Sequence, residues 1–282
     1  MQYATLSNGV KMPMVGYGVY QVEPHEAERC VSDALSVGYR MVDTAQAYRN
    51  EEGVGAAVRK SGLKRDEVFL VSKIWISNYG EEKALASIDE SLKRLQTDYI
   101  DLMLLHQPFC DRYGAYRALE KAYKAGKLRA IGVSNFFPDH FIDLASNADI
   151  PPMVNQVETH VFNQQTAPRK YMDEFGCSIM AWGPLAEGRN GLFTNPVLAE
   201  VGQAHGKSVA QVALRFLLQG GVIVIPKSTH VERMKENLGI LEFELTDAEM
   251  ERIRALDTRK SLFFDHHDGE VAKMFMSWRG LV

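Results

Sequence analysis

The sequence predicts a closed (β/α)8 TIM barrel, in which eight parallel strands are surrounded by helices. Short apolar segments rich in β-forming residues alternate along the chain with longer segments whose apolar residues recur at helical spacing. The strand-like segments are apolar almost throughout, as is typical of parallel strands buried on both faces. Eight such segments occur, and a chain of 282 residues is long enough for one barrel.

A β-hairpin is predicted to precede the barrel. Asn8-Gly9 is a pair that readily adopts the positive φ angles of a tight hairpin turn, and strand-like residues 4–6 and 10–12 flank it. The barrel strands are predicted at residues 15–19, 41–45, 68–74, 99–106, 130–134, 154–159, 178–185 and 222–226. Amphipathic segments of helical period lie between them, among them residues 26–37, 51–60, 83–95, 116–124 and 208–218.

The alternation of strands with helices predicts a parallel sheet, because each helical crossover returns the chain to the same end of the sheet. A doubly wound open sheet is the alternative arrangement. However, the first strand leads into Gly18-Val19-Tyr20-Gln21, which lacks the GxGxxG turn that seats a pyrophosphate in that fold. No repeat or linker interrupts the pattern, so residues 1–282 are expected to form one domain. Only the tail from Ser261 onward departs from regular alternation.

Composition favours a small-molecule partner. A formal net charge of -4 and a pI near 6.1 provide no broad attraction to nucleic acid or to an anionic membrane. Neither a secretory signal nor a membrane-spanning apolar run is visible. Three widely separated cysteines disfavour a disulfide framework and a four-cysteine zinc site. We therefore expect a monomer in the reducing cytoplasm, with no metal.

Three consecutive predicted strands carry an ionisable residue near their carboxyl ends: Asp43, Lys73 and His106. In a parallel barrel these ends face one mouth, where catalytic residues gather. Each residue alone has a structural explanation, as a helix cap, a solvent-exposed amine or a barrel-end imidazole. Together they suggest a site, because a buried lysine and aspartate require each other. Tyr48 follows Asp43, and a cation beside this phenol is expected to lower its pKa from about 10.

Residues 38–51, with the sequence GYRMVDTAQAYRNE, resemble the GxRxxDTAxxYxNE signature of the aldo-keto reductase family. The similarity continues through Lys73 and residues 98–106, 132–136, 155–158 and 225–229, in the family's order and over nearly the whole chain. Residues 182–188, WGPLAEG, resemble the 2,5-diketogluconate reductase-like branch of the family.

The resemblance implies a barrel plugged by the hairpin and a catalytic tetrad of Asp43, Tyr48, Lys73 and His106. A reduced nicotinamide would deliver hydride to a carbonyl carbon while Tyr48 delivers a proton to the oxygen. Lys73 would acidify the phenol, Asp43 would hold Lys73, and a neutral His106 would orient the carbonyl.

The resemblance also implies a cofactor site, with the carboxamide of the nicotinamide held by polar residues and its ring stacked on an aromatic one. Two cations and a hydroxyl at the adenosine end suit a 2′-phosphate, so NADPH is expected in preference to NADH. The cofactor residues implied are Gly18, Val19, Tyr20, Ser134, Asn135, Gln156, Trp182, Gly183, Pro184, Leu185, Lys227, Ser228, Arg233, Glu236 and Asn237.

The substrate pocket is expected to include Tyr20, Trp75 and His106, with the carboxyl-terminal segment folded as a loop over the mouth. In that segment Phe263, Phe264 and Trp278 either line the pocket or anchor the tail. Residues 265–268, DHHD, are expected to form a solvated loop rather than a metal site. Gln107 replaces a tryptophan found in many relatives, so substrate preference does not transfer from them.

The predicted function is NADPH-dependent reduction of aldehydes or ketones, such as small dicarbonyls, aliphatic or aromatic aldehydes, and keto sugars. Two alternatives remain open. One is a lyase or aldolase that uses Lys73 as a Schiff-base nucleophile. The other is a cofactor-binding regulatory or scaffold subunit with the same fold. Asp43 and Tyr48 argue against the first, and an intact tetrad argues against the second.

Overall fold

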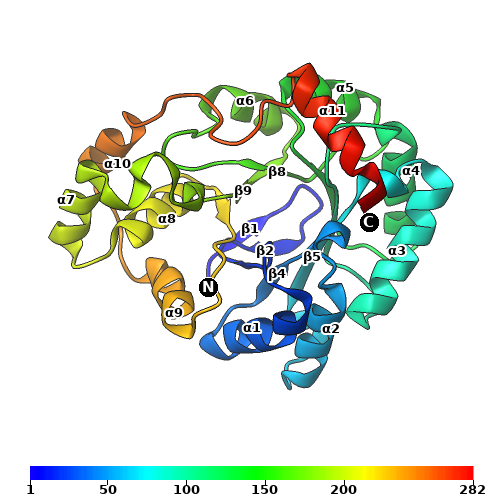
Figure 1. Cartoon of the computed structure of the whole chain (residues 1–282), viewed down its shortest axis with the longest axis horizontal. Coiled ribbons are helices and arrows are strands. Elements are labelled where there is room, and N and C mark those ends of the chain that lie inside the picture. The colour runs from blue at the N-terminus through cyan, green and yellow to red at the C-terminus, as the bar shows by residue number, and fades with distance from the viewer. Residues whose placement is uncertain (282) are drawn as a thin grey trace.

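The computed structural model describes residues 1–281 as a ring of parallel strands surrounded by helices (Figure 1). Strands β3 to β10 pair in chain order, each parallel to the next. The ring closes through a parallel bridge between Val15 and Val224, where Gly16 N–H donates to the Val224 carbonyl at 2.9 Å. The predicted barrel is therefore confirmed.

All eight predicted barrel strands are present, several of them shorter than predicted. They are β3 (Tyr17–Gly18), β4 (Met41–Asp43), β5 (Phe69–Ile74), β6 (Leu102–Leu105), β7 (Ile131–Ser134), β8 (Val154–Glu158), β9 (Ser178–Trp182) and β10 (Ile223–Val224). Their residues are almost all buried, as parallel strands between a barrel interior and a helical layer must be.

The helices surround the strands, except α11, which lies at the rim of the open end (Figure 1). They are α1 (Pro24–Val37), α2 (Glu51–Lys60), α3 (Glu81–Leu95), α4 (Arg112–Lys124), α5 (Pro138–Asn147), α6 (Thr166–Glu174), α7 (Pro196–His205), α8 (Val209–Gln219), α9 (Val231–Leu238), α10 (Asp247–Arg254) and α11 (Gly269–Ser277). Residues 1–281 also contain six 3₁₀ segments: η1 (Gln46–Tyr48), η2 (Arg65–Glu67), η3 (Ile76–Asn78), η4 (Ala186–Thr194), η5 (Gly239–Glu242) and η6 (Trp278–Leu281).

Helix ends explain small differences from prediction. Helix α1 begins two residues earlier than predicted, because Pro24 occupies its first turn, where a missing N–H costs nothing. Helix α4 begins four residues earlier, because the Asp111 carboxylate accepts the Gly114 N–H at 2.9 Å and caps it. Residues that start a helix in this way lie before its first periodic apolar residues, so a prediction from apolar periodicity places the start of the helix too late.

The predicted hairpin is also confirmed. Strands β1 (Tyr3–Thr5) and β2 (Lys11–Pro13) pair antiparallel, and Gly9 has a φ of 86° in the turn between them. Within the turn, the Asn8 side-chain amide donates to the Arg129 carbonyl, and Arg129 lies two residues before β7 begins. The hairpin therefore covers the amino ends of the strands and leaves the carboxyl ends open.

The carboxyl-terminal segment crosses the rim of the open end. After α10 it runs along the barrel and continues into α11 and η6 (Figure 1, orange to red). The expected loop over the mouth is thus a loop followed by a helix. Within the described part of the chain, no helix has the length and apolarity needed to cross a membrane.

Candidate active site

Asp43, Lys73 and Tyr48 meet at the carboxyl ends of β4 and β5. The Lys73 ammonium donates to Asp43 Oδ1 at 2.6 Å, to the Thr44 carbonyl at 3.0 Å and to the Tyr48 hydroxyl at 3.3 Å. Lys73 is fully buried and Asp43 is 2% exposed. The second Asp43 oxygen, Oδ2, accepts the Gln156 amide at 2.8 Å. A buried lysine and carboxylate thus neutralise each other beside a phenol.

The loop that carries Tyr48 is held on both sides by buried amides. Gln46 Oε1 accepts the Trp75 backbone N–H at 3.0 Å, while its Nε2 donates to the Ser87 carbonyl at 3.1 Å. Asn50 Nδ2 donates to the carbonyls of Val19 and Val22 at 3.0 and 3.1 Å. The phenol is therefore fixed by a satisfied polar network rather than by a surface loop.

The Tyr48 hydroxyl is protonated at neutral pH. Burial raises the pKa of this phenol well above 10.0, and the negative Asp43 carboxylate adds to the effect. The expectation of a Tyr48 pKa below about 10 is therefore wrong, because burial and the negative Asp43 carboxylate outweigh the neighbouring Lys73 cation. A protonated phenol is the form that a proton donor requires.

His106, at the end of β6, faces the same group. Its ring centroid lies 5.7 Å from that of Tyr48 and 5.2 Å from that of Trp75. Burial, together with the Lys73 cation, lowers the pKa of His106 well below 6.5, so the imidazole is neutral. Its Nδ1 is buried and has no hydrogen-bond partner within residues 1–281.

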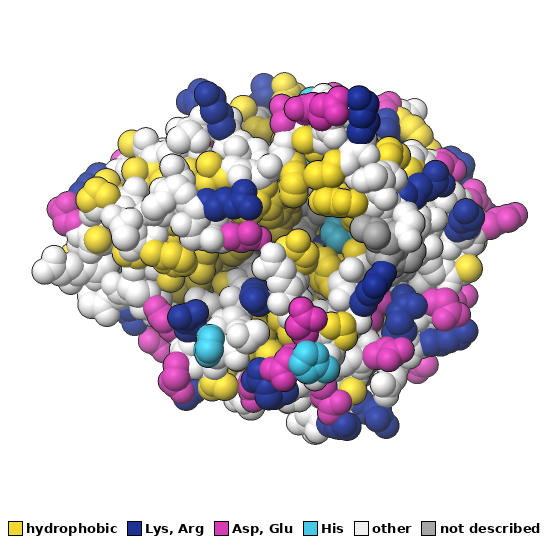
Figure 2. All heavy atoms as spheres, viewed as in Figure 1, with side chains coloured by type: hydrophobic (Ala, Val, Ile, Leu, Met, Phe, Trp, Pro, Cys, Tyr) yellow, Lys and Arg dark blue, Asp and Glu magenta, His cyan; other side chains and the backbone are white. Residues whose placement is uncertain are grey.

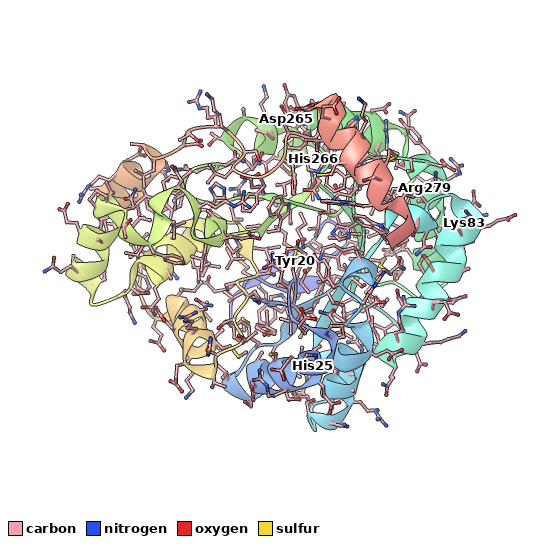
Figure 3. All side chains as sticks on the ribbon, viewed as in Figure 1. Tyr20, His25, Lys83, Asp265, His266 and Arg279 are labelled. Atoms are coloured by element: carbon pink, nitrogen blue, oxygen red, sulfur yellow. The ribbon has the colours of Figure 1, made fainter. Side chains whose placement is uncertain are left out.

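Aromatic side chains surround these groups. The Tyr20 ring lies 5.1 Å from the Tyr48 ring and is 53% exposed, whereas Trp75 is 6% exposed. Figure 3 labels Tyr20 near the centre of the barrel mouth, and Figure 2 shows a hollow there with hydrophobic side chains around its rim. The three predicted pocket residues, Tyr20, Trp75 and His106, therefore lie together at one opening.

The residues predicted to hold the nicotinamide form one hydrogen-bonded chain beside the tetrad. Asn135 Oδ1 accepts the Trp182 indole N–H at 2.8 Å, and Asn135 Nδ2 donates to the His106 carbonyl at 3.1 Å. The Ser134 hydroxyl donates to the Gln156 carbonyl at 2.9 Å. These contacts join β6 to β9 across the mouth and place the half-buried Trp182 next to the polar groups.

A second cavity, of about 550 Å³, contains the residues predicted to bind the adenosine end. Lys227 and Arg233 line it, are exposed, and have no acidic partner within residues 1–281. Glu236 lines it too, but its carboxylate accepts the Ser208 hydroxyl. The further lining residues from the predicted set are Leu185, Ser228 and Asn237. Two unpaired cations with neighbouring hydroxyl and amide groups form a donor set that fits phosphate.

The structure gives other reasons for four of the predicted cofactor residues. A Cβ on Gly18 would lie 2.8 Å from the Ile225 carbonyl, so barrel closure requires this glycine. Gly183 has a φ of 58°, which glycine adopts without strain. Val19 and Pro184 are buried. Their contact with a cofactor remains a prediction.

Residues 7–258 match the model of the Aldo/keto reductase family. The chain belongs to this family. It is 49% identical to the glyoxal reductase of Bacillus subtilis over 254 aligned residues, and the alignment covers 89% of this chain and 91% of that protein. It is 40% identical over 267 residues to the morphine 6-dehydrogenase of Pseudomonas putida, which covers 90% of each chain. This aldo/keto reductase is an oxidoreductase that acts on carbonyl groups.

Solved structures of relatives have the same fold. MGS-M4, an aldo-keto reductase from a deep-sea metagenome library, has a TM-score of 0.91 at 39% identity, over 94% of this chain and 98% of that one. The Bombyx mori aldo-keto reductase, solved in complex with NADP, has a TM-score of 0.88 at 30% identity, over 93% and 95% of the two chains.

In the tail of this aldo/keto reductase, the expected solvated loop is found for Asp265, His267 and Asp268, which are exposed, but not for His266. In the DHHD segment, predicted to be a solvated loop, His266 is 4% exposed. Its Nε2 lies 2.9 Å from Gln107 Oε1, and its ring stacks on Phe275 with centroids 5.3 Å apart. Gln107 therefore binds the tail. Within the described chain, no group of three or more His, Cys, Asp or Glu side chains could hold a metal ion.

Glu158, at the end of β8, was not singled out from the sequence although it anchors the tail. It is 4% exposed and receives hydrogen bonds from His160 Nε2 at 2.9 Å, the Ser261 hydroxyl at 2.5 Å and the Leu262 N–H at 2.8 Å. The available signal was a carboxylate closing a buried strand, the same signal that identified Asp43.

Proposed function

We propose that this aldo/keto reductase reduces aldehydes or ketones to alcohols with NADPH, and that Tyr48 is the proton donor. The observation that carries the proposal is a partly buried phenol whose hydroxyl lies 3.3 Å from the Lys73 ammonium and whose ring lies 5.7 Å from the His106 ring. The carbonyl activity of the family supplies the reaction class. Tyr48 is assigned as the proton donor because it lies at the apolar mouth.

The residues divide the reaction between them as follows. When bound, the reduced nicotinamide supplies hydride to the carbonyl carbon. Tyr48 gives its phenolic proton to the carbonyl oxygen, and the Lys73 N–H then stabilises the phenolate oxygen that remains. Asp43 keeps Lys73 protonated in its buried position. His106, being neutral, donates an N–H to the substrate oxygen and orients the carbonyl.

NADPH, rather than NADH, is proposed from the unpaired cations Lys227 and Arg233 on the 550 Å³ cavity. Arginine forms paired hydrogen bonds with phosphate, and lysine adds a point charge. Ser228, 6% exposed in the same wall, adds a hydroxyl. The Bombyx mori relative, whose structure holds NADP, is consistent with this proposal.

The proton-donor role is tested by Tyr48→Phe. Loss of the phenolic proton should lower kcat by about 10²–10⁴-fold, the usual contribution of general acid catalysis. The variant should still bind NADPH, as measured by quenching of tryptophan fluorescence. Tyr3→Phe, a change at an exposed tyrosine of the hairpin on the opposite end of the barrel, is the matched control. Undiminished turnover in Tyr48→Phe would refute the assignment.

The cofactor preference is tested by Lys227→Ala and Arg233→Ala. Each should weaken NADPH binding more than NADH binding, because only NADPH carries the extra phosphate. Lys235→Ala provides a control on the same helix, since Lys235 pairs with Glu232 at 3.1 Å and is not among the residues that line the cavity. Equal losses for both cofactors would remove the argument for NADPH.

The substrate is proposed to be a small dicarbonyl, an aliphatic or aromatic aldehyde, or a keto sugar. Relatives are named for glyoxal and for morphine, which differ widely in size. A panel of these carbonyls, ranked by kcat/KM with NADPH, would identify the preferred class. If the enzyme turned over none of these carbonyls, the proposal would be excluded.

The lyase alternative is disfavoured by the surroundings of Lys73. Its three N–H groups are donated to three oxygens in a fully buried position, so the amine offers no lone pair to a carbonyl. Borohydride treatment with a carbonyl substrate should therefore leave Lys73 unmodified, as measured by peptide mass. A trapped lysine adduct would favour the lyase.

A further inference from the structure

A short turn of the tail, Ser261 to Phe264, is fixed on the barrel by Glu158. The Ser261 hydroxyl donates to Glu158 and also accepts the N–H groups of Phe263 and Phe264, both at 2.9 Å. A second Glu158 oxygen accepts the Leu262 N–H. These bonds join residues more than 100 positions apart in the chain, so the turn has one defined place beside β8.

The turn presents Phe263 to the end of β9. The Phe263 ring meets the Trp182 ring edge to face, with centroids 5.1 Å apart. It also borders Gly183, at which an added Cβ would lie 3.8 Å from the ring. The Trp182 indole N–H also donates to Asn135 Oδ1 at 2.8 Å. Trp182 is therefore held by one contact from the barrel and one from the tail.

Phe263 is also in contact with the segment that follows β9. The Arg189 guanidinium lies 4.0 Å from the centre of the Phe263 ring, and its Nη1 donates to the Leu262 carbonyl at 2.6 Å. Arg189 belongs to η4 (Ala186–Thr194). Both Leu185, directly before η4, and Phe193, within it, line the 550 Å³ cavity. Arg189 thus connects the tail to one wall of this cavity.

Residues 186–194 need such a connection because their backbone is irregular. Ala186, Glu187 and Asn190 have positive φ angles of 51°, 49° and 53°, which non-glycine residues adopt at a cost. Gly188 and Gly191 are left-handed as well. Regular backbone hydrogen bonding therefore contributes little to the position of residues 186–194, and side-chain contacts have to define it.

We propose that Arg189 and Phe263 act together as a clasp that positions the cofactor. Phe263 sets the orientation of the Trp182 ring, and Arg189 holds residues 186–194 as a wall of the cavity, with Glu158 anchoring both through the turn. Both are positioning residues, since neither is assigned a contact with substrate or with the reacting atoms. The inference rests on the proposed function for the cofactor, but the connection itself is a property of the protein alone.

The connection is tested first without cofactor, by hydrogen–deuterium exchange of peptides covering residues 186–194. Arg189→Ala should increase exchange there, and Phe263→Ala should increase it to a similar extent. Phe264→Ala is the matched control from the same turn, because Phe264 packs on Phe275 instead, with centroids 5.6 Å apart. Unchanged exchange in Arg189→Ala, or an equal rise in Phe264→Ala, would overturn the clasp.

The consequence for the cofactor is tested by the NADP⁺ dissociation rate, measured by stopped-flow tryptophan fluorescence. Each single change removes the cation–π contact between Arg189 and Phe263, so each should accelerate dissociation by about 5- to 30-fold. The double variant should dissociate no faster than about the faster single variant, because the two residues act through each other. Effects that multiply would overturn the proposal.

Two further variants separate a clasp from other roles of Arg189. Arg189→Lys keeps the charge but loses the planar contact with Phe263, so it should behave like Arg189→Ala; full retention of slow dissociation would instead indicate a direct phosphate contact and overturn the clasp. Arg252→Ala, which removes an exposed arginine paired with Glu200, should change nothing. Should the wild-type protein not bind NADP⁺, the proposed function would fail, while the exchange experiment would still decide the connection.

Discussion

Asp43→Asn is the most informative change to the site, because it removes one charge from a buried pair and preserves side-chain size. The Lys73 ammonium has no exposure, and Asp43 supplies its only contact with a carboxylate among residues 1–281. Asp43 also serves two donors, Lys73 on Oδ1 and Gln156 on Oδ2. An asparagine amide has one acceptor oxygen, so in either orientation one of these donors would face an NH₂ group.

The expected loss of stability follows from these contacts. Removing one partner of a buried ion pair typically costs about 3–5 kcal/mol, because the remaining charge is left without compensation. For a chain of this size each 1 kcal/mol lowers Tm by about 2–4 °C, so a fall of roughly 10 °C is expected. The amine can escape part of the cost by losing its proton, since burial already lowers the Lys73 pKa below 10.5.

That escape determines how the loss depends on pH. In Asp43→Asn the folded-state pKa of Lys73 would lie below its unfolded value, so the unfolded state would bind more protons and stability would rise with pH. The deficit relative to wild type should therefore shrink between pH 7 and pH 10. Urea unfolding at several pH values, followed by circular dichroism, measures this directly.

Two variants complete the experiment. Asp43→Asn combined with Lys73→Met removes both charges and should recover much of the lost stability without restoring turnover. Glu28→Gln breaks an exposed pair with Lys60, whose side chains are 43% and 59% exposed, and should cost less than about 1 kcal/mol. A stable Asp43→Asn protein, or a double variant no more stable than the single one, would refute the buried-pair argument.

Three further outcomes are expected. Burial lowers the His266 pKa to about 4, below the ~6.5 of an unfolded histidine, so the free energy of unfolding should fall by about 3 kcal/mol between pH 6.5 and pH 4. Urea unfolding of His266→Phe over this pH range should show a smaller fall. Because burial keeps His106 neutral, kcat/KM should have no break near pH 6.5; a break there would count against a neutral imidazole. Burial raises the pKa of Cys30 and Cys177, so a maleimide should label Cys110 first, as peptide mass would reveal; early labelling of either buried thiol would contradict this.

The barrel and the convergence of the tetrad could be predicted from the sequence because both follow from local patterns. Apolar segments identified the strands, and parallel pairing brings their carboxyl ends to one mouth whatever the loops do. Asp43 and Lys73 lie on neighbouring strands, so their contact needed only the strand order and the direction of the chain. The same reasoning would have identified Glu158, which closes β8, had its carboxylate been given equal weight.

The environment of the tail could not be predicted in this way. The contact of His266 with Gln107 joins positions 159 apart, and neither local periodicity nor composition carries such information. Two adjacent histidines between aspartates suggest a solvated loop, yet the rings of Phe109, Phe264 and Phe275 surround His266. The prediction of a lowered Tyr48 pKa failed for a similar reason, since the direction of the pKa shift depends on how fully the phenol is desolvated.

In our proposals, the residues that carry out the chemistry of this aldo/keto reductase are separate from those that position its cofactor. Asp43, Lys73 and His106 stand at the ends of neighbouring strands, where ladder hydrogen bonds fix their backbone. The clasp of Arg189 and Phe263 is instead built from an irregular segment and a tail, held by a few side-chain bonds. Substitutions in the clasp should therefore change cofactor release while the tetrad keeps its geometry. Substitutions in the tetrad should abolish turnover while binding persists, so the two classes of variant can be distinguished by comparing kcat with the cofactor dissociation rate.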